Sequence, residues 1–147
     1  MTITEQLLLQ SQLILAAAMT GIIWLVQFVT YPQFLNVGGS EFDVYHKHHT
    51  AGIGRIVAPL MIVELGLSIW AVWHFRDTQI GAVILAATAI TLAIWVTTFA
   101  VQVPLHKLLV SRWSEPVIRK LISTNWIRTI LWSARLGLIG WAIFNGQ

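Results

Sequence analysis

The stretch GAVILAATAITLAIWVTTFAVQVPL, residues 81–105, contains no charged side chain. An α-helix of about 20 mainly apolar residues is long enough to cross the hydrocarbon core of a bilayer. The whole chain shares this character, because 56% of its 147 residues are hydrophobic and only 10% are charged, against about 25% charged in soluble domains. The sequence therefore predicts an integral membrane protein.

Three further apolar stretches have the length of a membrane span. Together with the first, they place the predicted spans at residues 11–35, 50–74, 79–103 and 125–144. Residues 1–10 contain no lysine or arginine, and the apolar run that follows is longer than that of a cleaved signal peptide. We expect an all-α integral membrane four-helix bundle in which residues 1–147 form a single transmembrane domain.

Positive charge is concentrated in the first and third predicted loops, whereas the second contains only Arg76. The basic side chains of the first and third loops are Lys47, Lys107, Arg112, Arg119 and Lys120. Because cytoplasmic loops carry an excess of lysine and arginine, we expect these two loops in the cytoplasm and both chain ends outside. Insertion topology thus explains the net charge of +3, and the expected partner is the lipid bilayer rather than nucleic acid.

The chain contains no cysteine. It therefore forms no disulfide, no thiolate zinc site and no cysteine-ligated iron–sulfur cluster. Quinone-linked thiol oxidoreductases of similar size are excluded as a class.

A shift of 71 residues aligns the two halves of the chain. It places ELGLSIWAVW (64–73) over RLGLIGWAIF (135–144), and it also matches Trp24 with Trp95 and Phe28 with Phe99. The repeat units cover residues 11–74 and 82–145, with two spans in each. We therefore expect two tandem helical hairpins related by a pseudo-two-fold axis along the membrane normal.

Two loop segments have the pattern of short amphipathic helices. SEFDVYHKHH (40–49) begins with a serine followed three residues later by an acid, and SEPVIRKLI (114–122) begins with a serine and has a proline near its first turn. We expect both to form short helices that lie at the cytoplasmic membrane interface, one in loop 1 and one in loop 3.

Glu64 and Arg135 each lie near the middle of a predicted span, and the repeat places them at equal depth. A lone charge at that depth costs about 3 kcal/mol or more, so we expect the two to pair inside the bundle. Such a pair could equally serve only to fix the register of the helices.

Other polar side chains converge on the cytoplasmic half of the spans. Asn125, Arg128, Trp132 and Arg135 share one face of the fourth span. Candidate partners for the arginines at similar depth are Gln27, Tyr31, Gln102 and His106. Pro32 and Pro104 would free backbone carbonyls nearby. Together with Glu64, these side chains predict a ligand-binding cavity, although snorkelling near the span ends would also explain some of them.

Histidines supply the remaining chemistry of the sequence. His46 and His49 stand three residues apart, and with His106 they could act as catalytic proton carriers or ligate a non-haem metal ion. Alternatively, they are solvated at the interface. Haem is less expected, because no histidine lies in the apolar core of a span. Trp24, Trp95 and Trp132 are deep enough to line a cavity for a flat ligand.

The segments YPQF (31–34), YHKHHTAGIGRIVAPLMIVEL (45–65), VPLHKLL (103–109) and NWIRTILWSAR (125–135) resemble a group of small four-span bacterial membrane proteins. This group is distantly similar to the anthrone-oxygenase-like family, which shares a Pro-Leu-Asn or Pro-Leu-His step after the third span and a Trp and an Arg early in the fourth. The resemblance extends from about Trp24 to Arg135. It implies a bacterial inner membrane location and an aromatic or polyketide-like substrate oxidised in the membrane. This chain has His106 where relatives carry asparagine.

The favoured function is a polar intramembrane site that binds a small lipophilic or aromatic ligand, with oxidoreductase or oxygenase-like chemistry. Two alternatives stay open. One is a carrier or channel for an anion or small solute, with the arginine stripe as its pathway. The other is a non-catalytic accessory subunit of a larger membrane complex, and a homo-oligomer is also compatible with the sequence.

Overall fold

The computed structural model describes residues 2–110 and 112–146, which are entirely helical apart from short connections. Its elements are α1 (Ile3–Leu25), η1 (Val26–Thr30), α2 (Tyr31–Gln33), α3 (Gly39–Phe75), α4 (Gly81–Thr97), η2 (Thr98–Gln102), α5 (Val103–Leu108) and α6 (Glu115–Asn145). They form four continuous helical stretches, and each is long and apolar enough to cross a membrane. The predictions of an all-α fold and of an integral membrane protein are confirmed at this level.

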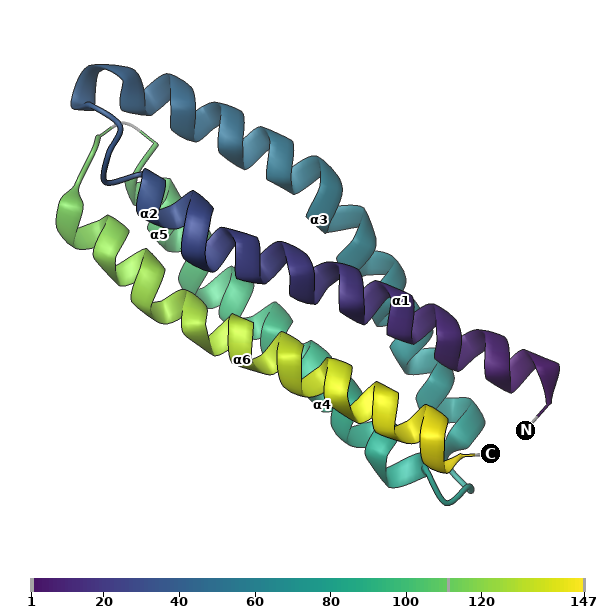
Figure 1. Cartoon of the computed structure of the whole chain (residues 1–147). Coiled ribbons are helices and arrows are strands. Elements are labelled where there is room, and N and C mark those ends of the chain that lie inside the picture. Colours follow the sequence, from purple (N-terminus) through teal and green to yellow (C-terminus); the bar gives the residue numbers. More distant parts are fainter. Residues whose placement is uncertain (1, 111, 147) are drawn as a thin grey trace.

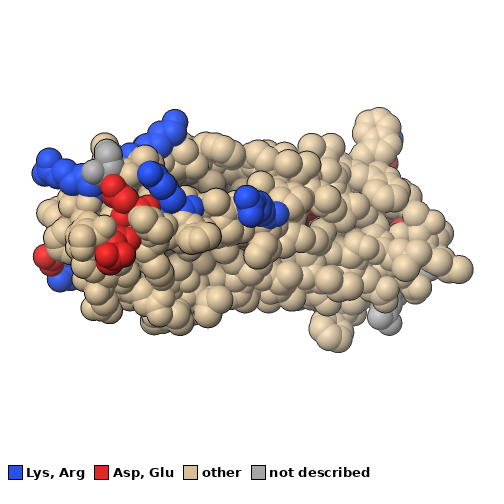
Figure 2. All heavy atoms as spheres, turned by 90° about the horizontal axis from the view of Figure 1, so that it is seen from above, with Lys and Arg blue, Asp and Glu red and all other residues tan. Residues whose placement is uncertain are grey.

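The four stretches pack as an antiparallel bundle (Figure 1). Close backbone contacts join α1 to α3, α3 to α4, α4 to α6 and α6 to α1, so each long helix has two neighbours. Both chain termini lie at one end, which we call the terminal end. The connecting residues 34–38, 109–110 and 112–114 lie at the other, the loop end, where lysine and arginine side chains gather (Figure 2).

The first helix begins earlier than the predicted residue 11, because a capping box fixes its start. The Thr2 hydroxyl accepts a hydrogen bond from the Glu5 backbone N–H at 3.2 Å, and the Glu5 carboxylate accepts one from the Thr2 N–H at 2.6 Å. These reciprocal bonds satisfy two of the free donors at a helix start. The Thr2-x-x-Glu5 pattern was readable in the sequence.

Among the described residues, the expected short interfacial helices are not seen as elements of their own. Residues 40–49 form the first turns of α3, and residues 115–122 form the first turns of α6, each continuous with a span. Separation would require a break near Gly52 and Gly54, but no glycine among the described residues has a positive φ, so α3 passes through both. Both segments are helical, as expected, but they extend the spans.

Two π-helical turns interrupt the first and third spans, in each case just before a proline. The Tyr31 N–H bonds to the Val26 carbonyl and the Val103 N–H bonds to the Thr98 carbonyl, both five residues back. Pro32 and Pro104 lack an N–H, and their rings crowd the carbonyl four residues earlier. A widened turn relieves that crowding while keeping the backbone paired inside the membrane.

The N-terminal half of α3 bows away from the rest of the bundle (Figure 1). Among the described residues, α6 has close backbone contacts with η1, α2, η2 and α5, whereas α3 has none with these four elements. Pro59 lies within α3 and removes one hydrogen bond of the helix, which allows a bend. The bow leaves room between α3 and the π-helical turns, and this room is where the site forms.

Candidate functional site

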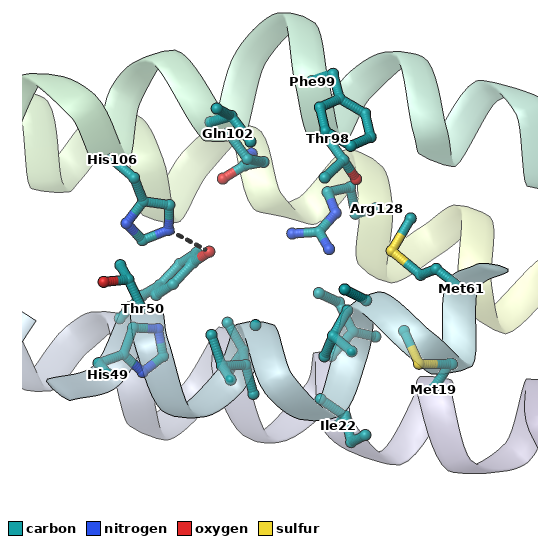
Figure 3. A pocket seen from close by; sticks show the side chains of 18 of the residues that line it. Met19, Ile22, His49, Thr50, Met61, Thr98, Phe99, Gln102, His106 and Arg128 are labelled. Atoms are coloured by element: carbon teal, nitrogen blue, oxygen red, sulfur yellow. Dashed lines mark hydrogen bonds between the residues drawn. The ribbon is translucent and has the colours of Figure 1, made fainter. Parts of the chain in front are cut away.

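A cavity of about 570 Å³ lies between the bowed half of α3 and the elements η1, α2, η2, α5 and α6. Its deep part is apolar, with Met19, Ile23 and Met61, and its polar side chains lie nearer the loop end (Figure 3). The polar and ionisable side chains in its wall are Tyr31, His46, His49, Thr50, Thr98, Gln102, His106, Lys107 and Arg128. The cavity is therefore amphipathic along the bundle axis.

The cavity opens sideways between α3 and the η2–α5 segment. On α3, Gly54, Ala58 and Ile62 line it and are exposed, and Ile62 keeps 61% of its surface accessible. Across the opening, Phe99 is 58% exposed and Lys107 lies at the rim near the loop end. In a bilayer these side chains face lipid, so a lipid-soluble molecule has direct access to the cavity.

A chain of hydrogen bonds links three side chains in the cavity wall. The Tyr31 hydroxyl lies 3.0 Å from His106 Nε2, and His106 Nδ1 lies 2.9 Å from His46 Nε2 (Figure 3 shows the first bond). Either direction of donation suits two neutral imidazoles, because each ring has one donor and one acceptor nitrogen. Such a chain can pass a proton from one end to the other. Its members come from α2, α5 and α3.

The same geometry does not fit the expected metal site. Both ring nitrogens of His106 are engaged, one by Tyr31 and one by His46. His49 stacks on His106 with ring centroids 6.1 Å apart, rather than directing a nitrogen at a shared point. Within residues 2–110 and 112–146, no group of three histidine or acidic side chains is arranged to hold a metal ion. The three histidines do come together, but as hydrogen-bonding and stacking partners.

Arg128 is a buried cation with few partners. Only 7% of its surface is exposed, and its guanidinium reaches into the cavity (Figure 3). One guanidinium nitrogen donates to the Asn125 side-chain oxygen at 3.2 Å, while the buried Nε has no hydrogen-bond partner. No carboxylate among the described residues forms an ion pair with it. A buried charge normally requires such compensation, so this guanidinium is left short of anionic partners.

Of the residues expected to serve Arg128, Gln27 and Gln102 bond to other groups, whereas the Tyr31 hydroxyl lies beside the guanidinium. Gln27 accepts from the Asn125 amide at 2.9 Å and donates to the Ile122 carbonyl at 3.2 Å. Gln102 donates to the Thr124 hydroxyl at 3.1 Å, and its own buried oxygen has no donor. The bond from Asn125 to Gln27 positions the Asn125 side chain, and the Asn125 oxygen in turn positions the Arg128 guanidinium.

The predicted pairing of Glu64 and Arg135 is confirmed. Their side chains are fully buried, with 2.6 Å between the nearest guanidinium nitrogen and carboxylate oxygen. The Arg135 guanidinium also donates to Thr91 at 2.7 Å, to Ser68 at 3.0 Å and to Gln12. Groups from all four spans therefore meet at this one guanidinium, which lies outside the cavity wall.

The sequence interpretation did not include Gln12, Ser68 or Thr91. Each is almost completely buried, and each is a polar residue inside an otherwise apolar span. That isolation was a usable signal, because a buried polar group in a membrane needs an internal partner. Arg135, predicted near the middle of the fourth span, was a candidate partner for Ser68 and Thr91, whereas Gln12 stood at the predicted end of the first span.

The predicted site residues divide into two groups. Tyr31, His46, His49, Gln102, His106 and Arg128 line the cavity. Gln27, Glu64, Asn125, Trp132 and Arg135 are buried but lie outside its wall. Among the deep tryptophans only Trp95 lines it; Trp24 is 40% exposed and bonds Ser133 on the outer surface at 3.1 Å, so its expected place in the cavity was wrong.

Comparison of this chain with models of known protein families, with curated protein sequences and with solved structures finds no match. The resemblance to the anthrone-oxygenase-like family therefore stays a prediction. Function must be argued from the cavity itself.

Proposed function

We propose that the protein binds a small lipophilic or aromatic ligand within the membrane, in the cavity beside Arg128. The observation that carries the proposal is the combination of this cavity with a guanidinium that lacks an ion pair. Ligand sites are typically cavities of about 300–1,000 Å³ that are mainly apolar, with a few polar groups that fix orientation. The volume of about 570 Å³ lies inside that range.

The deep end of the cavity is apolar and its polar side chains lie nearer the loop end, which supports a ligand with an apolar body. Met19 and Met61 lie at the deep end, and methionine adapts its shape to different apolar partners. Trp95 and Phe99 lie on one wall with ring centroids 5.5 Å apart, and they offer aromatic surface to a flat molecule. The polar group of the ligand would face Arg128 and His106.

Oxidoreductase or oxygenase-like chemistry belongs to this proposal through the Tyr31–His106–His46 chain. In an oxygenase-like reaction molecular oxygen would accept the electrons of the aromatic ligand, and a hydrogen-bonded chain beside the ligand would supply a route for the protons that are released. The role assigned here to the histidines is proton transfer, because their arrangement does not fit a metal ion. The resemblance stated above points to the same reaction class.

We also propose that the loop end faces the cytoplasm of a bacterial cell and that the fold descends from a duplicated hairpin. Lysine and arginine gather at the loop end (Figure 2), which is the pattern of cytoplasmic loops. In favour of duplication, each half contains a π-helical turn shortly before a proline, and Trp24–Phe28 and Trp95–Phe99 pack at the same 5.5 Å centroid distance.

A cavity-filling substitution tests the proposed function. Ala58 lines the cavity from α3, so Ala58→Phe should place a ring in the ligand volume. We expect this change to weaken binding of methyl anthracene-9-carboxylate or methyl dodecanoate to protein in phosphatidylcholine nanodiscs by about tenfold. Ala18→Phe, on an exposed face of α1 outside the cavity, is the matched control. Equal binding by both variants and wild type would refute the proposal.

The carrier alternative is favoured by one observation, the unpaired charge of Arg128, and opposed by another. Below the cavity, the Arg135 network joins all four spans and fills the interior. A solute would have to break that network to cross. Anion flux into liposomes that requires Arg128 would nevertheless favour a carrier over a binding site.

A further inference from the structure

We infer that the ligand is a lipophilic carboxylic acid, held as the carboxylate by Arg128, with its apolar body directed toward Met19 and Met61. This inference rests on the proposed function and narrows its ligand to one chemical class. The choice of this ligand class depends on the charge of the site rather than on its shape.

Charge counting favours a singly charged anion. Among the described residues that line the cavity, Arg128 is the one buried cation, and Lys107 is exposed at the rim. None of these described residues has an acidic side chain. A bound monoanion would bring the buried site to neutrality, whereas a cation would add to an uncompensated charge. A neutral ligand would leave the guanidinium without a counter-charge.

The geometry of the guanidinium favours a planar carboxylate. One guanidinium nitrogen of Arg128 donates to the Asn125 side-chain oxygen, and the Nε has no hydrogen-bond partner. A guanidinium can offer parallel N–H groups to both oxygens of a carboxylate, and such charge-assisted bonds are stronger than those between neutral groups. The Arg135 site supplies an internal comparison, because there the carboxylate of Glu64 occupies the guanidinium at 2.6 Å. At Arg128 the ligand would take the place that Glu64 takes at Arg135.

The mouth of the cavity fits an amphiphile of this kind. It runs from Phe99 in the third span to Lys107 near the loop end. A fatty or aromatic acid in a bilayer keeps its head near the interface and its body in the hydrocarbon, which matches the order of groups along this opening. Lys107 would meet the head first, and Arg128 would hold it inside.

The test compares each acid with its own methyl ester, which has nearly the same shape but no charge. The probes are anthracene-9-carboxylate and dodecanoate, with their methyl esters, bound to protein in phosphatidylcholine nanodiscs at neutral pH. We expect wild type to bind at least one acid about tenfold more tightly than its ester. Arg128→Gln should remove that preference, and Arg119→Gln, an exposed arginine on the same helix, should keep it.

A second measurement does not depend on a variant that folds. The ¹³C chemical shift of carboxyl-labelled dodecanoic acid reports its ionisation, and we expect the bound acid to stay ionised at a lower pH than the same acid in empty nanodiscs. The titratable groups that face Arg128 across the cavity are Tyr31 from α2, His46 and His49 from α3, and His106 and Lys107 from α5. Protonation of the histidines at low pH would add positive charge and would act in the same direction.

The outcomes separate the inference from the proposed function. Ester binding equal to acid binding, or an acid preference that survives in Arg128→Gln, would overturn the carboxylate inference while the binding function stands. A bound acid that protonates as it does in empty nanodiscs would also overturn it. If wild type binds none of the four probes, both the inference and the proposed function fail.

Discussion

Two arginines seven residues apart on α6 differ in how their guanidinium groups are partnered in this bundle. Arg135 has an ion pair with Glu64 and hydrogen bonds to Gln12, Ser68 and Thr91 from the other three spans. Arg128 donates to Asn125 of its own helix and lies beside the Tyr31 hydroxyl, has no ion pair with a described carboxylate, and borders a cavity. Both are almost fully buried.

We propose that the difference separates a charge that stabilises the fold, Arg135, from a charge that binds a ligand, Arg128. A guanidinium surrounded by acceptors from every helix holds the spans in register, and nothing further is needed to neutralise it. A guanidinium with an empty side toward a cavity is kept in an unfavourable state until an anion arrives. Three substitutions test whether this distinction is real.

The largest effect is expected at Arg135. Arg135→Gln removes the partner of a fully buried carboxylate and leaves Glu64 unpaired, so we expect a loss of about 3–5 kcal/mol in the free energy of unfolding. Steric trapping in bicelles measures this quantity. Arg119→Gln, which breaks an exposed pair with Glu115, should change it by less than about 1 kcal/mol. If the loss in Arg135→Gln were as small as that in Arg119→Gln, the buried network would not stabilise the fold.

A smaller loss is expected at His106. His106→Phe keeps the ring volume but leaves the Tyr31 hydroxyl and His46 Nε2 without partners. We expect a cost of about 1–3 kcal/mol in the same unfolding measurement, because unsatisfied polar groups in the interior are unfavourable. His48→Phe, an exposed position without such bonds among the described residues, is the control. A neutral effect at His106 would argue against a formed hydrogen-bond chain.

The smallest effect on stability is expected at Arg128. Arg128→Met removes a buried charge without an ion pair at the loss of one hydrogen bond, so the free energy of unfolding should stay within about 1 kcal/mol of wild type or rise. Ligand binding should nevertheless suffer. A destabilisation as large as that of Arg135→Gln would mean that Arg128, like Arg135, stabilises the fold, and the two arginines would not differ in role.

Much of the polar interior could be predicted from the sequence. The 71-residue shift placed Glu64 and Arg135 at equal depth, and the high cost of a lone intramembrane charge made their pairing the expected outcome. The same reasoning brought Tyr31, Gln102, His106 and Arg128 to one end of the bundle. In both cases the prediction needs only the depth of each residue in the membrane, which follows from the span positions and, for Glu64 and Arg135, from the repeat.

The cavity itself could not be predicted, because it depends on how α3 packs. Hydropathy indicates that a segment is a span but not that its first half stands away from the other helices. Trp24 illustrates the same limit, because the direction of its side chain depends on the rotation of α1, and in the structure it faces outward. Depth follows from composition, whereas orientation requires tertiary contacts.

The π-helical turns have a consequence for how such a site can arise. Each one adds a single residue to an α-helical path, and one residue turns everything downstream by about 100° around the axis. Tyr31 follows the first turn and His106 follows the second, and the two meet across the interior at 3.0 Å. We therefore expect that removing one residue from either π-helical turn would rotate Tyr31 or His106 by about 100° around its helix axis and break this contact.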